Sequence, residues 1–432
     1  KARLPSAYAL AVNNCSTENL KQSQSHRDMM IECYQFLEKH GPLEIIAHNA
    51  HFDFKFAHSH YFQSLVTDDW YQWKTKNSVI DSLELLRSIH LFKTELNTIN
   101  IPMTNFAIPE YSLGRVCNEN GIFHEQHTAE GDVKSLVDLY GLMINEAPDI
   151  VGQAHLCSNK HEVRRIVNDS MFFCAAVGTG PSLKARALVP VAINKFKNAL
   201  ICVDISMIKP HELNALTSWD IFTQMKNVER GNAIVRVPLN KGKVFFPPEY
   251  HVFCRSSQSI AKGNELMECA KRVRKNMYIK EAANEAWKHY ENIFTSDGSL
   301  ESSIYEDGWC TPEESNFIFQ FNSIDWDQRW QLIESTKSSL GNNRIRQLAK
   351  RLIFDHDQSL LPNDLVQVYE ERIRNKLFDP DASTNVPWVN LPKVLIQLEK
   401  LKSDLIDQDK LKELQAYYED VSEGLLYSKS MF

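Results

Sequence analysis

Helical and strand-like spacings of apolar residues alternate along the first third of the chain. Between 26 and 40, apolar residues recur at i, i+3, i+4 and i+7, which predicts an amphipathic helix that begins after Ser25. Gly41-Pro42 ends this pattern, and the run 43–47 has the length and β-branching of a buried strand. This alternation predicts an α/β first domain.

A second strand and helix repeat the arrangement. The strand 79–81 ends at Asp81, which is placed to cap a helix over 82–90. Two more helices are predicted at 113–120 and 129–146. The apolar face of the last of these helices consists of Val133, Leu136, Val137 and Tyr140.

The pattern changes after about residue 170. Five short β-type runs predict a small β barrel or sandwich with one helical insertion near 210–226. The runs are 171–177, 187–193, 199–205, 233–237 and 244–246. From about 265 to the end the spacing is helical and the composition charged. A helical last domain is therefore expected.

Composition places the chain among multidomain globular proteins. It has 432 residues, of which 43% are apolar and 24% charged, which excludes a disordered chain. No run of about 18 apolar residues is present to cross a membrane. The net charge of −7 gives no general attraction to phosphate, so a nucleic-acid site would have to be a local basic groove.

The nine cysteines are scattered and never spaced as Cys-x-x-Cys. This usage is typical of a reducing compartment, and we expect a cytoplasmic protein without a structural zinc. His48 and His51 lie close to Asp53, but a strand-to-helix turn does not supply the closed tetrahedral set that zinc prefers.

Two strings carry the candidate chemistry. His127 precedes Asp132 by five residues across a predicted helix start, and Asn49 and Asp53 follow a predicted buried strand. Polar residues at the carboxyl ends of strands in α/β sheets commonly form ligand sites. Carboxylates that hold divalent ions, with a histidine as general base, are what phosphodiester hydrolysis requires. The alternative is a helix cap at Thr128 with an incidental surface histidine.

These strings resemble the motifs of the 3′–5′ exonucleases on the ribonuclease-H-like fold that use four acids and a histidine, the DEDDh type. The string 127–132 matches the third motif, His-x-Ala-x-x-Asp, and 48–53 resembles the second, an Asn followed by Phe-Asp. Later segments, 171–204 and 344–377, are similar to the SH3-like and helical C-terminal domains of the exonuclease I family.

The resemblance implies three domains. These are a ribonuclease-H-like exonuclease domain at 1–148, with a mixed sheet and helices, an SH3-like domain with a linker helix at 149–262, and a helical domain at 263–432. In that family the domains clamp single-stranded DNA and release nucleotides from its 3′ end. We therefore expect a monomer that binds single-stranded DNA and no membrane, with a single-strand-binding protein as a candidate partner.

The resemblance also assigns roles to residues. It implies that Asp132 binds a metal ion, that Asp53 supports a second ion through water, and that His127 takes a proton from the attacking water. The implied ion is Mg²⁺, with Mn²⁺ as an alternative. Asn49 is a candidate contact for the terminal nucleotide, against the alternative of bonding the strand-end backbone.

One motif of the family is absent. The leading strand should supply Asp-x-Glu, but the earliest acids are Glu18 and Asp28, neither on a predicted strand. Because the sequence begins at Lys1 rather than Met, we expect the leading strands to lie upstream, which would leave the apolar faces of helices 26–40 and 129–146 uncovered. Two alternatives stay open: a non-catalytic protein that binds single-stranded DNA or a partner, and a 3′–5′ exoribonuclease.

A dense basic run lies in the predicted helical domain. It contains Lys271, Arg272, Arg274 and Lys275. Such a run is usually a solvated helix face. In a DNA clamp it would follow the phosphates while nearby aromatic rings stack on the bases, so we predict that it binds substrate.

Overall fold

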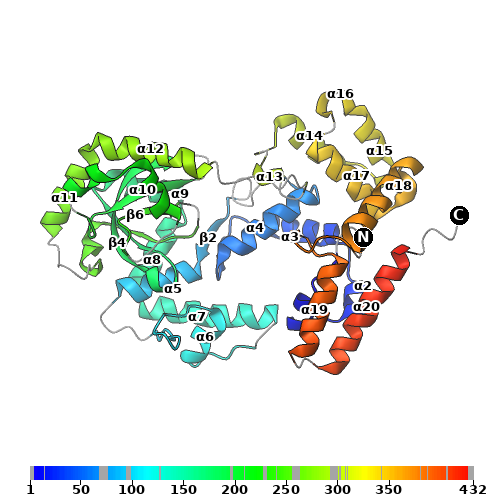
Figure 1. The fold of residues 1–432 in the computed structure, drawn as a ribbon, viewed down its shortest axis with the longest axis horizontal. Helices are drawn as coiled ribbons and strands as arrows, with labels where there is room; N and C mark the ends of the chain where they lie inside the picture. The colour runs from blue at the N-terminus through cyan, green and yellow to red at the C-terminus, as the bar shows by residue number, and fades with distance from the viewer. Residues whose placement is uncertain are drawn as a thin grey trace. The chain divides into compact units, whose positions relative to one another are not determined.

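The fold is a mixed α/β architecture that is mostly helical, seen here in a computed structural model (Figure 1). The structure describes residues 4–13, 15–67, 76–93, 99–125, 128–194, 198–208, 210–226, 231–239, 241–254, 263–291, 300, 303–306, 308, 310–341, 343–379, 381–386, 388–404 and 407–426. No helix in these ranges combines the length and the apolar character that crossing a membrane requires.

The chain forms two compact units. The first comprises Lys1–Lys39, His58–Trp70 and Asp297–Phe432, and the second comprises His40–Ala57 and Tyr71–Ser296. The division falls within helix α4, Ala50–Gln63. The division at 148 and 262 stays a prediction.

The first unit is helical. Its N-terminal helices are α1 (Ala7–Val12), α2 (Thr17–Gln22) and α3 (His26–His40). Its later elements are α13 (Ser303–Glu306), α14 (Pro312–Ser323), α15 (Trp326–Ser335), α16 (Lys337–Leu340), α17 (Arg344–His356), η4 (Gln358–Leu360), α18 (Asn363–Ile373), η5 (Arg374–Phe378), α19 (Leu391–Ser403) and α20 (Gln408–Leu426).

The N-terminal helices of this unit pack on the C-terminal ones. Helix α1 contacts α19 and α20, and α2 contacts α20. The Thr17 N–H donates to Glu413 Oε1 at 2.6 Å, and the Tyr418 hydroxyl donates to the Pro5 carbonyl at 2.8 Å. Buried Leu10 belongs to the same apolar core as the buried side chains of α17 and α19. Segments some 400 residues apart in the sequence therefore share one core.

The second unit contains both sheets. Its elements up to Asp169 are β1 (Glu44–Ala47), the start of α4, β2 (Ser78–Asp81), α5 (Ser82–Phe92), α6 (Leu113–Glu119), α7 (Ala129–Glu146), α8 (Pro148–Cys157) and α9 (Lys160–Asp169). The remaining elements are β3 (Phe173–Val177), η1 (Gly180–Ser182), β4 (Lys184–Asn194), β5 (Ala199–Asp204), η2 (Pro210–Ala215), α10 (Ser218–Lys226), β6 (Ile234–Pro238), β7 (Phe245–Phe246), η3 (Pro248–Phe253), α11 (Gly263–Lys275) and α12 (Met277–Glu291).

Strands β1 and β2 form a two-stranded parallel sheet. Their register pairs Glu44 with Ser78 and Ala47 with Asp81, so the two strands end side by side. Parallel strands place their carboxyl ends at one edge, where α/β folds gather polar side chains. This edge therefore carries His48, Asn49 and Asp81.

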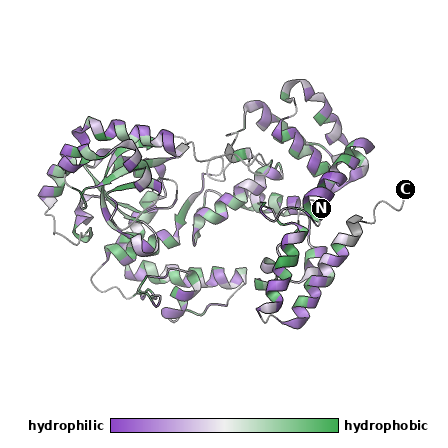
Figure 2. Cartoon of the chain, in the orientation of Figure 1, coloured by the Kyte–Doolittle hydropathy of each residue, from purple (hydrophilic) through white to green (hydrophobic). Residues whose placement is uncertain are grey.

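The five-stranded sheet is antiparallel, in the order β6-β5-β4-β3-β7. Its strands are largely buried on both faces, and hydrophobic residues dominate them in Figure 2. Along β3, Phe173 and Ala175 face the core formed with α9, while Cys174 and Ala176 face the core shared with α5 and α12. This alternation follows from the two-residue period of a strand.

The sequence-based elements correspond closely to those observed. The five predicted β runs are β3 to β7, and the predicted helices 26–40 and 129–146 are α3 and α7. The apolar face expected for α7 is packed only in part, however, since Tyr140 packs against the core but the fully buried side chains lie elsewhere on the helix. Its buried side chains are Ser135, Leu139 and Met143, which meet α6 and α8, whereas Val133 and Val137 are 61% and 64% exposed.

Candidate active site

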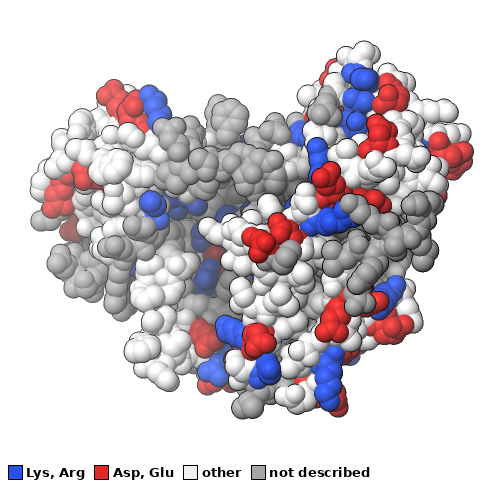
Figure 3. All heavy atoms as spheres, turned by 45° about the vertical axis from the view of Figure 1, so that its right-hand side comes forward, with Lys and Arg blue, Asp and Glu red and all other residues white. Residues whose placement is uncertain are grey.

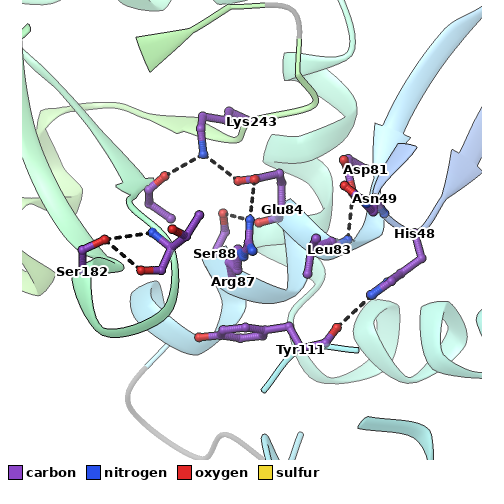
Figure 4. A network of polar contacts seen from close by, with 12 residues as sticks. His48, Asn49, Asp81, Leu83, Glu84, Arg87, Ser88, Tyr111, Ser182 and Lys243 are labelled. Carbon is purple, nitrogen blue, oxygen red and sulfur yellow. Dashed lines mark hydrogen bonds and ion pairs between the residues drawn. The ribbon is translucent and has the colours of Figure 1, made fainter. Parts of the chain in front are cut away.

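The edge where β1 and β2 end is held together by the Asp81 carboxylate (Figure 4). Its Oδ1 accepts hydrogen bonds from the Leu83 N–H at 3.0 Å and the Asn49 N–H at 3.1 Å. The first bond caps α5, as the sequence predicted. The second fixes Asn49, whose φ of 62° lies in the left-handed region and turns the chain into α4.

His48 has a structural role at this edge. Its Nε2 lies 2.8 Å from the Tyr111 carbonyl oxygen and its Nδ1 lies 2.9 Å from Ser82 Oγ. Because a carbonyl only accepts, Nε2 carries the proton and Nδ1 of a neutral ring accepts from the hydroxyl. Burial lowers the pKa of His48 and favours this neutral form.

Asp53 lies in the first turn of α4, one turn beyond the Asn49 bend. Its side chain is exposed, although partial burial of the carboxyl still raises its pKa. On the same turn, burial lowers the pKa of His51, with the charges of Lys241 and Lys55 acting in the same direction. The start of α4 thus combines a carboxylate with nearby cations.

Asp132 lies in the first turn of α7, and the structure pairs it with a histidine that the sequence reasoning did not single out. His124 Nε2 lies 2.7 Å from Asp132 Oδ1. The imidazole is 8% exposed and the carboxylate 53% exposed, so a largely buried ring orients a solvent-facing acid. His127, the predicted general base, lies outside the described residues.

The His124 ring fits because Gly114 leaves room for it. A Cβ at position 114 would lie 3.0 Å from His124 Nδ1. That nitrogen is buried and has no hydrogen-bond partner among the described residues. The one sequence signal for this contact is the position of His124. It lies in the short connection between α6 and α7, just before the helix whose first turn carries Asp132. Spacing alone did not show which histidine reaches Asp132.

The described residues do not by themselves complete a metal site. Nowhere in the described ranges do three or more His, Cys, Asp or Glu side chains converge on a position that could hold an ion. Asp53 and Asp132 come from separate helix starts and supply two carboxylates. A hard octahedral cation such as Mg²⁺ needs more oxygen ligands than two side chains give.

The predicted basic run forms the last turns of α11. Lys271 pairs with Glu268 at 2.6 Å. The Arg274 guanidinium donates to the Met171 and Ser170 carbonyls at 2.8 and 2.6 Å, which fastens α11 to the segment before β3. Arg272 and Lys275 are exposed. Substrate binding by this run stays a prediction, and it rests mainly on Arg272 and Lys275, because Lys271, although also exposed, is paired with Glu268.

The described residues on one face of the molecule carry charges of both signs (Figure 3). On the face shown in Figure 3, Lys and Arg are interspersed with Asp and Glu. A protein of net charge −7 with such a surface can attract polyanions only where cations gather locally.

Comparison with solved structures identifies the fold. The chain matches Escherichia coli exonuclease I in complex with a dT13 oligonucleotide with a TM-score of 0.78 and 17% identity, over 98% of this chain and 89% of that one. It matches the exonuclease I of Methylocaldum szegediense with a TM-score of 0.78 and 17% identity, over 98% and 90%. The expected resemblance is therefore confirmed as a match of fold.

Another matching structure is a complex of exonuclease I with SSB-Ct, at a TM-score of 0.77 and 17% identity, over 98% of this chain and 89% of that one. No protein-family model matches the chain, and no curated protein sequence matches it significantly. The shared property is thus the exonuclease I fold over nearly the whole chain, at low identity.

Proposed function

We propose that this protein acts on single-stranded DNA as an exodeoxyribonuclease that works from the 3′ end. The observation that carries the proposal is the match over 98% of the chain to exonuclease I, including a structure with dT13 bound. The match extends beyond the part that carries the nuclease motifs. We read the β1–β2 region as ribonuclease-H-like, the five-stranded sheet as SH3-like, and the last helices as the third domain.

In this proposal Asp53 and Asp132 are the carboxylates offered to Mg²⁺ or Mn²⁺, and His127 accepts a proton from the attacking water. Bound divalent ions supply an activated water and stabilise the charge that develops on the phosphate. Asp53 and Asp132 each lie at a helix N-terminus, where the helix dipole favours negative charge. Asn49, whose backbone N–H binds Asp81 where β1 and β2 end, is the candidate contact for the terminal nucleotide.

The test is digestion of a 3′-labelled DNA oligonucleotide with Mg²⁺ present. Asp132→Ala and His127→Ala should each lower the rate at least about 100-fold while binding of the oligonucleotide persists. Asp138→Ala, an exposed acid on the same helix, is the matched control and should cleave like the wild type. Digestion that continues unchanged in the first two variants would refute the assigned roles.

A second candidate function is non-catalytic binding of single-stranded DNA or a partner. It is favoured because no group of three or more possible metal ligands is found among the described residues. Wild-type protein that binds the oligonucleotide but leaves it intact at every Mg²⁺ and Mn²⁺ concentration would establish this function. Metal-dependent release of nucleotides that EDTA stops would exclude it.

We also propose a partner, a location and an oligomeric state for this protein. Because one matching exonuclease I structure contains SSB-Ct, we propose a single-strand-binding protein as a partner of this chain as well. The cysteines are thiols and not disulfides, which suits the cytoplasm. A clamp formed within one chain needs no second copy, so we propose a monomer.

A further inference from the structure

Two small residues of α7 hold the chain segment around His124 against that helix. The Ser135 hydroxyl donates to the Phe123 carbonyl at 3.0 Å. On the other side of the histidine, a Cβ at position 131 would lie 2.4 Å from the Glu125 carbonyl oxygen, so the close approach of the backbone requires Gly131. The backbone on both sides of His124 is thereby fixed on the start of α7.

The His124 ring is fixed as well. A Cβ at position 114 would lie 3.0 Å from the ring Nδ1 and 3.1 Å from Cε1, so the ring packs closely over Gly114 of α6. The histidine side chain is 8% exposed. A buried ring that is packed on one helix and bonded to the next has little freedom to turn. It therefore presents Nε2 in one direction, toward Asp132.

The contact with Asp132 assigns the proton of this ring. Nε2 lies 2.7 Å from Asp132 Oδ1, and a carboxylate only accepts, so Nε2 carries the proton and donates it. Nδ1 is buried and has no hydrogen-bond partner in the described part of the chain, so a proton on Nδ1 would be left unpaired. The surroundings thus fit the ring with its proton on Nε2.

Asp132 has one oxygen bound and the other open. Its side chain lies in the first turn of α7 and is 53% exposed. Oδ1 accepts from His124, whereas Oδ2 forms no hydrogen bond or ion pair with any residue that the structure describes. Hydrogen bonds to one side of a carboxylate orient it as a metal ligand.

We propose that His124 is a positioning residue for Asp132, which holds Oδ1 and leaves Oδ2 for a divalent ion. The proposal rests on the proposed function, in which Asp132 binds such an ion. His124 acts through Asp132, because its own ring is buried and its Nε2 is already engaged. Removal of such an outer partner typically weakens metal binding by about 10–100-fold.

The test is binding of Mn²⁺ to the full chain without DNA, with electron paramagnetic resonance to detect the free ion. His124→Asn is too short to place a donor where Nε2 lies and should weaken Mn²⁺ binding about tenfold or more. His124→Gln can place its amide nitrogen near that position and should restore most of the affinity. In an Asp132→Ala background, His124→Asn should have no further effect, because the histidine acts through the carboxylate.

Two glycine variants separate positioning from a merely structural role. Gly114→Ala adds a methyl group against the His124 ring and should weaken Mn²⁺ binding although it changes neither partner of the hydrogen bond. Gly141→Ala is the matched control on α7, because its added Cβ would meet no described atom within 4 Å beyond the adjacent helix backbone, and it should bind like the wild type. Thermal unfolding of each variant shows that it is folded.

The outcomes separate this role from the nuclease proposal. Loss of Mn²⁺ binding in His124→Asn and its recovery in His124→Gln support the positioning role. Equal binding by the wild type and His124→Asn overturns it, as does equal weakening by both substitutions or a wild type that binds no Mn²⁺. Digestion of DNA is measured separately. A wild type that binds Mn²⁺ through this contact but leaves DNA intact keeps the positioning role while the nuclease function fails, and digestion that His124→Asn does not change has the opposite meaning.

Discussion

Asp81 shows how one buried acid organises the candidate site. Its carboxylate is 3% exposed and holds both the cap of α5 and the turn into α4. Burial raises the pKa of Asp81 to about 6, and the nearby charge of Glu84 adds to the effect. Asp81 thus stabilises two backbone turns, but its ionised form is disfavoured because the carboxylate is kept from water.

This environment makes stability depend on pH. Because the pKa of Asp81 is higher in the fold than its ordinary value of 3.8, the folded state binds more protons between these values. Tighter proton binding by Asp81 stabilises the folded state fully below about pH 4. This stabilisation is lost as pH rises through about 6, which lowers the free energy of unfolding by about 3 kcal/mol. The Asp81→Asn variant keeps an oxygen that accepts hydrogen bonds but has no proton to release in this range. Its free energy of unfolding should therefore not fall with this transition.

Urea unfolding at pH 4.5, 6 and 8 measures the difference. The wild type should lose stability relative to Asp81→Asn as pH rises across this range. Asp138→Asn, an exposed change on α7, should follow the wild type at each pH. If the free energies of unfolding of the wild type and of Asp81→Asn change in parallel with pH, burial does not raise the pKa of Asp81.

At the level of elements, helix α7 has two unequal apolar faces. Leu139 and Met143 are fully buried against α6 and α8. Val133 and Val137, four residues apart on another face, stay largely exposed. Burial of an aliphatic side chain stabilises a fold, whereas an exposed one contributes little to it. The two faces should therefore respond differently to substitution.

The double variant Val133→Lys/Val137→Lys should change the free energy of unfolding by about 0.5 kcal/mol or less. Leu139→Ala should cost about 2–5 kcal/mol, because it removes a buried side chain and leaves a cavity. Chemical denaturation of the purified variants gives both values. A large cost for the lysine variant would show that this face is covered in solution.

At the level of the whole molecule, an acidic chain adopts the exonuclease I fold over nearly all of its length. The proposed function takes single-stranded DNA as its substrate, whereas the exoribonuclease alternative takes RNA. Proteins distinguish RNA from DNA by the 2′-hydroxyl, which a site shaped for DNA excludes.

Competition between matched oligonucleotides tests this preference. Unlabelled DNA should displace a labelled DNA oligomer at a concentration about tenfold lower than RNA of the same sequence, a difference of about 1.4 kcal/mol. A duplex of that sequence serves as a control for strandedness and should compete poorly. RNA that competes as well as DNA or better would favour the exoribonuclease alternative.

Local sequence patterns were enough to predict the main elements and the bonds between near neighbours. The periods of 3.6 and 2 predicted α3, α7 and the five strands, because these patterns depend only on how side chains project from a regular backbone. The cap of α5 by Asp81 was predicted for the same reason, since donor and acceptor lie two residues apart.

Which surfaces and side chains contact one another became known from the three-dimensional structure. It chose the Leu139 face of α7 over the Val137 face, it joined α1 to α19 and α20, and it placed Gly242 against Asp81. It also paired His124 with Asp132, a contact that the spacing of the motif did not indicate. Each of these contacts depends on the packing of neighbouring elements or the path of a loop, which no local pattern of apolar and polar residues specifies.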